Sequence, residues 1–177
     1  DLSTASYDSV SLSVSSQQTN PRGIAINNDG TALYICGTAP ASAHQYTLST
    51  PYDLSTGSYA SKTVSLSSQE SYPNGLIFNN DGTSMYIVGS GSDTVYQYTL
   101  SPAFDVSTAS YASKSMSVSS QASTPTGLSF NSDGTKIFVI GENPAIFQYS
   151  LSSAYDISTG SYDSVTHALS PNYGNDI

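Results

Sequence analysis

Hydrophobic and polar residues alternate along this chain in short runs, and the same order of runs recurs. Val64-Ser-Leu66 and Met116-Ser-Val118, for example, place an apolar side chain at every second position. Strict alternation is typical of a β-strand with one packed face and one solvated face. No segment shows the 3.6-residue apolar period of an amphipathic helix. The pattern therefore predicts an all-β protein with almost no helix.

The runs recur with a fixed spacing, which identifies an internal repeat. Pro21, Pro73 and Pro125 lie 52 residues apart. A related stretch, DLSTASY in its first copy, opens four times, at Asp1, Asp53, Asp105 and Asp156. The chain thus holds three complete repeats, preceded by a partial fourth copy.

Each repeat predicts four short strands, A to D. Strand A covers 23–27, 75–79 and 127–131, strand B covers 32–37, 84–89 and 136–141, and strand C covers 44–49, 96–101 and 147–152. Strand D is the alternating stretch Val10–Val14, Val64–Leu66, Met116–Val118 and Val165–Leu169. Asp-Gly between strands A and B predicts a tight hairpin, because glycine readily adopts a positive φ.

Four antiparallel strands per repeat, with a period near 50 residues, are typical of a β-propeller blade. The string P-x-G-[IL]-x-[IF]-N-x-D-G-T-x-x-[YF]-[IV]-x-G, followed by Q-Y-x-L, resembles the repeats of YVTN-type and NHL-type β-propellers. This resemblance implies a fold but no particular activity, because propellers host many functions. A right-handed β-solenoid is the competing architecture, although its coils are usually shorter and lack two tight hairpins.

We expect residues 1–177 to form a single β-propeller domain or half-domain. Its parts are an orphan outer strand (1–20, the strand itself over Tyr7–Ser16), blade 1 (21–72), blade 2 (73–124), blade 3 (125–170) and a non-repeat tail (171–177). Propellers usually have four to eight blades, so three are too few to close a ring. Unpaired blade edges favour association. We therefore predict a homodimer or another homo-oligomer; a fragment of a longer propeller is the alternative.

The charge of the chain restricts its partners. It is −9, with 4 Lys and Arg against 13 Asp and Glu. This balance argues against binding to nucleic acid or to an anionic membrane surface. Charged residues make up only 10% of the chain, and hydroxyl-bearing residues take their place. Together with a single cysteine, Cys36, which we expect to be a buried small hydrophobe, this composition suggests an extracellular, virion or cell-surface protein of a bacterial or phage setting.

The acidic and histidine residues give no catalytic or metal-binding pattern. Asp29, Asp81 and Asp133 stand in the predicted hairpin turns, where an aspartate bonds its own backbone; Asp53, Asp105 and Asp156 are interpreted as turn caps. His44 and His167 take positions that are apolar or aromatic in other repeats, so we interpret both as packing substitutions. We expect no catalytic residue, no metal and no cofactor.

Comparison of the repeats singles out one face of the predicted propeller. The A–B turns and C–D connections hardly vary, whereas the D–A and B–C loops do, and loops of varied sequence on a constant scaffold are typical ligand sites. Drift among duplicated loops is the alternative explanation. The candidate ligand-binding residues on these loops and the adjoining strands are Arg22, Tyr72, Asn74, Asp93, Tyr96, Thr126 and Glu142.

The sequence therefore predicts a non-enzymatic binding or structural module that presents variable loops to a glycan or a protein. One alternative is a propeller-type enzyme, such as a lactonase or lyase, with a site at the channel mouth. Another is a unit that only assembles with itself.

Overall fold

The computed structural model describes residues 2–169, and these form three four-stranded antiparallel sheets. Blade 1 contains β1 (Pro21–Ile26), β2 (Ala32–Thr38), β3 (Ala41–Leu48) and β4 (Gly57–Ser65). Blade 2 contains β5 (Pro73–Phe78), β6 (Ser84–Gly89), β7 (Thr94–Thr99) and β8 (Ser110–Ser117). Blade 3 contains β9 (Pro125–Phe130), β10 (Lys136–Gly141), β11 (Ala145–Leu151) and β12 (Gly160–Ala168). The predicted all-β architecture with four strands in each of three repeats is confirmed.

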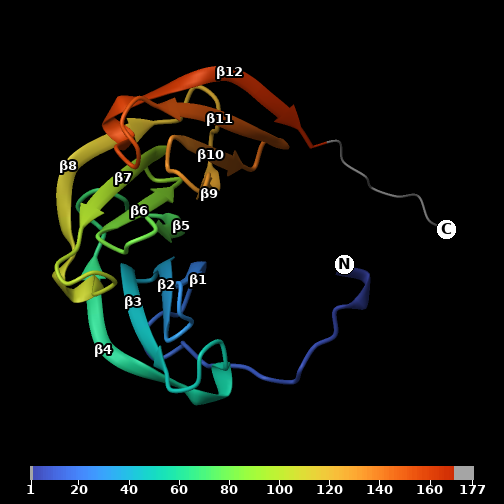
Figure 1. The fold of residues 1–177 in the computed structure, drawn as a ribbon, viewed down its shortest axis with the longest axis vertical. Helices are drawn as coiled ribbons and strands as arrows, with labels where there is room; N and C mark the ends of the chain where they lie inside the picture. Colours follow the sequence, from blue (N-terminus) through green and yellow to red (C-terminus); the bar gives the residue numbers. More distant parts are fainter. Residues whose placement is uncertain (1, 170–177) are drawn as a thin grey trace.

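The three sheets stand side by side in an open arc. The first strands, β1, β5 and β9, lie innermost, and the last strands, β4, β8 and β12, follow the outer rim (Figure 1). Within each blade the strands are hydrogen-bonded in chain order. The arc leaves an opening between blade 1 and blade 3 (Figure 1).

The Asp-Gly turns join the first two strands of each blade as the sequence predicts. Gly30, Gly82 and Gly134 have φ values of 73°, 72° and 71°. In the first turn the Asp29 carboxylate accepts hydrogen bonds from the Thr31 backbone N–H (3.0 Å) and hydroxyl (2.6 Å), and the other two turns repeat these bonds. These bonds fix the turn geometry, which confirms the interpretation of the three aspartates as turn residues.

The connection between the third and fourth strands contains a short 3-10 helix in every blade: η2 (Leu54–Thr56), η3 (Val106–Thr108) and η4 (Ile157–Thr159). Asp53, Asp105 and Asp156 cap these helices, each accepting the backbone N–H two residues later. This confirms their interpretation as caps.

The outer strands begin earlier than we predicted from the alternation. β4 starts at Gly57 and β8 at Ser110, inside the stretches assigned to connections. In blade 1 the pairing shifts register between Gln45 and Tyr46 of β3, opposite a bulge in which Ser61 has φ 58°. A bulge interrupts the two-residue alternation, so the sequence pattern shows only the half of the strand that follows it.

Within the single chain, no strand forms over Tyr7–Ser16, so the outer strand predicted in residues 1–20 has no partner among the sheets of its own chain. The only regular element described before β1 is a 3-10 turn, η1 (Leu2–Thr4). A strand requires a neighbour for its backbone hydrogen bonds, and this segment joins none of the three sheets. It lies instead against blade 1 through Leu12 and Val14. The predicted tail, 171–177, lies outside the described residues.

The hydrophobic core lies between the blades. One cluster joins blades 1 and 2 and includes Tyr34, Cys36, Leu76 and Ile87; a second joins blades 2 and 3. Cys36 is fully buried, as expected, and burial raises the pKa of its thiol to about 12. Each sheet therefore depends on its neighbours to cover its faces.

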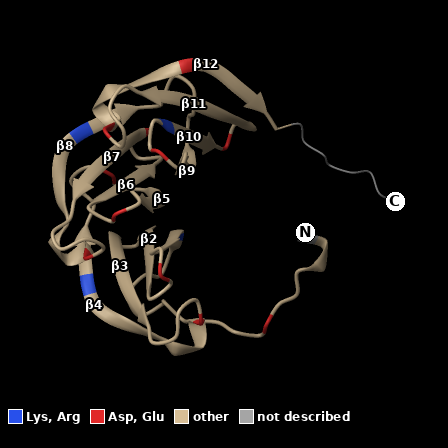
Figure 2. Cartoon of the chain, in the orientation of Figure 1, with Lys and Arg blue, Asp and Glu red and all other residues tan. Residues whose placement is uncertain are grey.

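Polar contacts repeat at both internal junctions. A tyrosine of the second strand donates its hydroxyl to a carbonyl of the next blade: Tyr34 to Phe104 (2.8 Å) and Tyr86 to Tyr155 (2.6 Å). A lysine of the outer strand pairs with the next blade's capping aspartate, Lys62 with Asp105 and Lys114 with Asp156, both at 2.7 Å. These lysines are the blue segments of β4 and β8 in Figure 2.

The glycine of each Pro-x-Gly stretch allows the innermost strands to approach closely. A Cβ on Gly75 would lie 2.9 Å from a Leu128 methyl, 3.0 Å from a Val88 methyl and 3.3 Å from the Gly127 Cα. On Gly127, which borders the opening, it would meet only Ile140 of its own blade, at 3.2 Å. The glycine is thus required where a further blade lies alongside.

We predict that Gly75→Ala lowers the free energy of unfolding by about 1–3 kcal/mol, because the added methyl overpacks the junction of blades 2 and 3. Gly127→Ala is the matched control and should cost clearly less. Urea unfolding at low protein concentration, where association contributes least, gives both values. Equal losses would contradict this account of the inner strands.

Candidate functional site

The two faces of the arc are built as the sequence predicts. On one face the Tyr52 hydroxyl of a C–D connection donates to the Asn28 carbonyl of an A–B turn (2.8 Å). On the other, Gln18 of the D–A loop bonds the B–C loop at Pro40 (2.7 Å) and Ala39 (3.0 Å). The varied loops therefore share one face, and the constant connections share the other.

Three candidate residues come together at the inner end of this varied face. Arg22, Asn74 and Thr126 hold the same position in β1, β5 and β9 and line one depression of about 220 Å³. The Asn74 amide donates to the Pro125 carbonyl (3.0 Å), which ties β5 to β9. Arg22 and Thr126 are exposed. The Asn74 amide also donates to the Ser90 hydroxyl (3.2 Å), and the Thr126 hydroxyl donates to the Ile140 carbonyl (3.4 Å), so the Arg22 guanidinium is the main group that the site offers to a ligand.

The other four candidates are dispersed. Tyr72 is 58% exposed on the loop before β5, and Glu142 is exposed on the loop before β11. The Asp93 carboxylate accepts the Thr124 backbone N–H (3.1 Å) and so holds two loops together. Tyr96 contacts Tyr111 edge-on within blade 2, with ring centroids 6.0 Å apart. None of the four lines the depression formed by Arg22, Asn74 and Thr126.

Part of the loop variation has a structural cause that comparison of the repeats did not reveal. Glu70 occupies the place of Gln18, is fully buried, and accepts hydrogen bonds from the Gly91 N–H (2.9 Å) and the Ser92 hydroxyl (2.7 Å). In blade 3 the contact is reversed, because the Asn143 amide donates to the Gln121 carbonyl (2.7 Å). Each D–A loop is therefore matched to its own B–C loop.

The two histidines have different surroundings. His44 is 6% exposed, lies edge-on to Tyr59 and contacts the Ser42 hydroxyl through Nε2 (2.8 Å), which confirms it as a packing residue. His167 is exposed, so its interpretation as a packing substitution is wrong. The corresponding residues Leu12, Val64 and Met116 pack against the blade that follows them, whereas within residues 2–169 no further sheet lies beside His167. Within residues 2–169, no three His, Cys, Asp or Glu side chains gather as a metal site would require.

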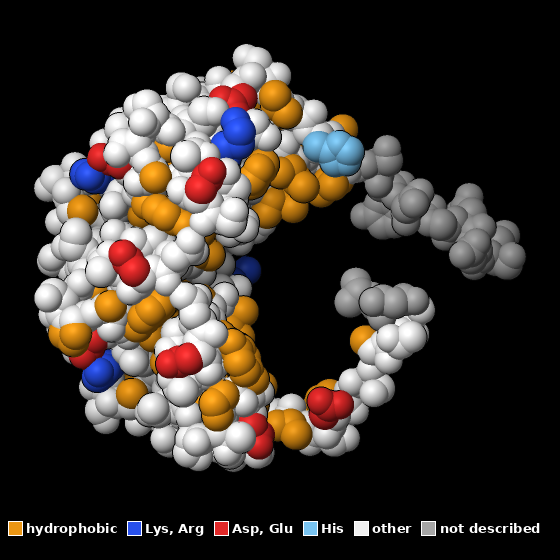
Figure 3. Space-filling model, in the orientation of Figure 1, with side chains coloured by type: hydrophobic (Ala, Val, Ile, Leu, Met, Phe, Trp, Pro, Cys, Tyr) orange, Lys and Arg blue, Asp and Glu red, His pale blue; other side chains and the backbone are white. Residues whose placement is uncertain are grey.

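The two surfaces that border the opening are apolar. Blade 3 presents Phe138, Ile140 and Ile146, which we call the open face of blade 3. Blade 1 presents the exposed Ile24, and beside it Leu33 and Ile35, which are only 3% and 4% exposed because Leu12 and Val14 cover them; we call this the open face of blade 1. Figure 3 shows hydrophobic side chains on both sides of the opening. Ile24 is 64% exposed, whereas its counterpart at the internal junction, Leu76, is 2% exposed.

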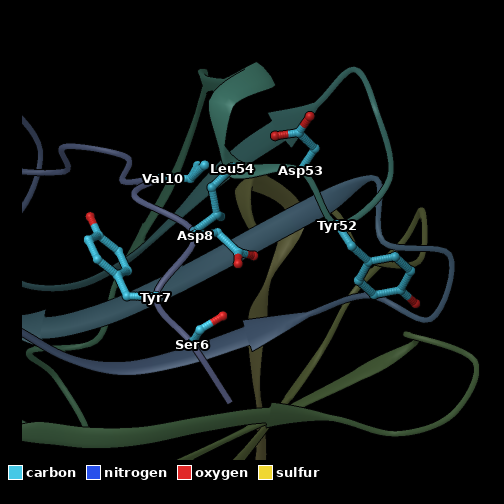
Figure 4. Close-up of a pocket in the computed structure, with 7 residues that line it drawn as sticks. All are labelled: Ser6, Tyr7, Asp8, Val10, Tyr52, Asp53 and Leu54. Atoms are coloured by element: carbon cyan, nitrogen blue, oxygen red, sulfur yellow. The ribbon is translucent and has the colours of Figure 1, made fainter. Parts of the chain in front are cut away.

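A pocket of about 440 Å³ lies between the N-terminal segment and blade 1 (Figure 4). Asp8 and Val10 border it from the segment, and Tyr52, Asp53 and Leu54 border it from the C–D connection. At the internal junctions the corresponding space is crossed by the ion pairs of Lys62 and Lys114. Val10 takes the lysine position here and leaves the space open.

No family model matches the chain, and no curated protein matches it. Solved structures do. One is a functionally unknown protein from Desulfotomaculum acetoxidans, at 13% identity and a TM-score of 0.58, covering 81% of this chain and 41% of that protein. Two others are provisionally named 6-phosphogluconolactonases. The one from Bacteroides uniformis has 12% identity and a TM-score of 0.59, and the match covers 86% of this chain and 43% of that protein. The one from Bacteroides fragilis has 15% identity and a TM-score of 0.59, and the match covers 90% of this chain and 45% of that protein.

The chain spans less than half the length of each of these three proteins. At such identities the similarity shows the fold alone, and that fold is β-propeller-like. The finer resemblance to YVTN and NHL repeats stays a prediction. No helix in the described part of the chain is long and apolar enough to cross a membrane.

We predict that His44 makes the fold sensitive to mild acid. Burial lowers the pKa of His44 below its ordinary value of 6.5. The unfolded chain then binds the proton more readily, so the free energy of unfolding decreases as the pH falls below 6.5 towards the lowered pKa. Phenylalanine is the residue at this position in blade 3. His44→Phe should therefore reduce the pH-dependent loss of unfolding free energy by on the order of 1 kcal/mol between about pH 7 and about pH 5.

Urea unfolding at the two pH values measures this difference, with His167→Phe as the exposed control. Lys114 and Ser158 hold the pKa of Asp156 below 3.8, so this carboxylate stays ionised in the folded chain at both pH values. An unchanged pH dependence in His44→Phe would contradict the assignment.

Proposed function

We propose that this chain is a non-enzymatic structural and binding module, a three-blade arc that forms a propeller ring with a second copy and presents its varied loops to a ligand. The observation that carries the proposal is the pair of apolar open faces. They are the two halves of the surface that is buried at each internal junction. Exposed apolar surface of this kind is typical of a protein interface.

The sequence at both open faces supports a second copy as the partner. Phe138 of blade 3 stands at the position of Tyr34 and Tyr86, whose hydroxyl groups donate to the next blade. Val165 stands at the position of Lys62 and Lys114, which pair with an aspartate of the next blade. The segment that lies before blade 1 carries Val10 at the same lysine position. Both ends thus specify a junction without the lysine–aspartate pair, as the junction between blade 3 of one copy and blade 1 of another requires.

The use of the carboxylates supports a non-enzymatic role. The aspartates of the hairpin turns and caps accept hydrogen bonds from their own loops. The Glu70 carboxylate accepts hydrogen bonds from the B–C loop, and Asp163 pairs with Lys136 at 3.2 Å. General acid–base catalysis needs a carboxyl group directed at a substrate. These groups are directed at the protein itself.

We expect light scattering to give a solution mass of about 37 kDa, twice the 18.5 kDa of the chain. Gly127→Val should shift the protein towards the monomer, because Gly127 would face β1 of the second copy as Gly75 faces β9. Ser152→Val, an exposed substitution away from both open faces, is the control. A monomer of the unaltered chain at all concentrations would overturn the proposed ring.

The depression lined by Arg22, Asn74 and Thr126 supports a ligand with hydroxyl and carboxylate groups, such as an acidic glycan, since arginine binds carboxylates by bidentate hydrogen bonds. A glycan array should give signals that Arg22→Ala reduces. Tyr72→Ala tests the neighbouring loop. Silence across the array would contradict the binding role and leave an assembling unit.

A further inference from the structure

The N-terminal segment has the backbone shape of an outer strand although it joins none of the described sheets. Ser9 has φ 60°, and Ser61, Ser113 and Ser164 of the three outer strands have φ 58°, 57° and 57°. In those strands this residue forms the bulge at which the pairing with the third strand shifts register. A positive φ is uncommon for a residue with a side chain. Its occurrence at Ser9 gives the segment the bulge that pairing requires.

The segment also packs on blade 1 as an outer strand packs on the following blade. Leu12 lies against Gly57, as Met116 of β8 lies against Gly160 of blade 3. After the segment, the Val14 carbonyl accepts the backbone N–H groups of Gln17 (3.0 Å) and Gln18 (2.9 Å). Leu66 and Val118 accept the corresponding pairs after β4 and β8. The segment therefore occupies the place of the outer strand of a blade that would precede blade 1.

Its sequence identifies which blade that is. Tyr7-Asp8-Ser9-Val10 is identical to Tyr162-Asp163-Ser164-Val165 of β12. The outer strands of blades 1 and 2 have Tyr-Ala-Ser-Lys at these positions instead. The segment thus matches the outer strand of blade 3.

The aspartate in this sequence has a cationic partner within its own sheet in blade 3 alone. Asp163 accepts a hydrogen bond from the Gln148 amide (2.6 Å) and pairs with Lys136 (3.2 Å). At the position of Lys136, blades 1 and 2 have Ala32 and Ser84. The charge of Asp8 is therefore complementary to that of Lys136 in the sheet of blade 3. Within this chain, that sheet lies across the opening from the N-terminal segment (Figure 1).

We propose that residues Tyr7–Val14 of one copy replace β12 as the outer strand beside β11 of the second copy. Asp8 then takes the place of Asp163 and bonds Lys136 and Gln148 of the second copy. The inference rests on the proposed ring of two copies and names the strand that closes it. The N-terminal segment and β12, which share the sequence Tyr-Asp-Ser-Val, would occupy the same place between blade 3 and the next blade 1, and only one of them fits there.

The N-terminal segment suits this place better than β12 does. It carries Leu12 and Val14 on the side that packs against blade 1. β12 carries the exposed His167 at the Leu12 position, and its Val165 is 49% exposed. Burial of an apolar side chain stabilises the junction, whereas burial of an imidazole requires a hydrogen-bond partner. β12 covers the β11 edge in the single chain and is displaced in the ring.

The register of β12 defines a cross-linking test. Ser150 of β11 pairs with Ser161 of β12, and Ser6 stands at the position of Ser161. Ser6→Cys/Ser150→Cys, oxidised with diamide, should form a covalent dimer on a non-reducing gel. Each single cysteine variant is a control, and Cys36 can remain because it is buried. Ser150→Cys/Ser161→Cys should lock β12 in place and shift the protein to monomer until the disulfide is reduced.

A charge exchange tests the same contact without cysteine. Asp8→Lys should weaken the dimer by about tenfold or more, because it places two cations together at Lys136. Adding Lys136→Asp to the same chain should restore association. The carboxylate introduced at β10 attracts the ammonium group introduced in the N-terminal segment and repels the retained Asp163, so the exchanged strand is favoured at the edge of β11. Light scattering against dilution measures both variants.

The outcomes separate the two proposals. If the unaltered chain is a dimer, but Ser6→Cys/Ser150→Cys forms no disulfide between chains and Ser150→Cys/Ser161→Cys stays dimeric with β12 locked, the strand exchange is overturned and the ring remains. A cross-link within a single chain would likewise overturn it. A monomer under all conditions would overturn both.

Discussion

The structure depends on one constraint: a blade cannot bury both faces of its sheet by itself. Each four-stranded sheet has apolar side chains on both faces, and at the two internal junctions these faces are covered by the neighbouring sheet. Ile137 and Val139 of blade 3 are fully buried because blade 2 covers them, whereas Phe138 and Ile140, on the opposite face of the same strand, are only partly covered. In an array of such repeats, the first and the last sheet each have one face that no neighbouring sheet covers.

The repeat made the internal parts of the fold predictable. The Asp-Gly turns, the capping aspartates and three of the four strands in each blade depend on local residues whose spacing is visible in the sequence. The start of the outer strand was missed because the Ser61 bulge changes which face the side chains occupy. The orphan strand is not formed in the single chain for a different reason: Val10-Ser-Leu12-Ser-Val14 has a strand pattern, but a pattern does not supply the neighbouring backbone that a strand needs.

The position of the candidate site could be predicted from the sequence, but the residues that line it could be predicted only in part. Arg22, Asn74 and Thr126 come together because the same repeat position lies at the inner end of each blade. Asp93 and Tyr96 were selected from the same loops and strands, yet one bonds a backbone N–H and the other packs against Tyr111. Residues that vary between repeats vary partly because each D–A loop must fit its own B–C loop, as the exchange of Gln18 for Glu70 shows.

The departures from the repeat are more informative than the repeat itself, because they gather where the array ends. Phe138 and Val165 lack the hydroxyl and the ammonium group with which an internal blade binds its successor, and Val10 lacks the lysine that an internal Asp53 would bind. Lys136 and Asp163 form an ion pair found in neither of the other blades, and Asp8 repeats one half of it. Independent drift at the two ends would not be expected to make the same aspartate and valine substitutions in both terminal copies. In the proposed strand exchange the N-terminal segment and β12 take the same place beside β11, which accounts for the same aspartate and valine in both segments.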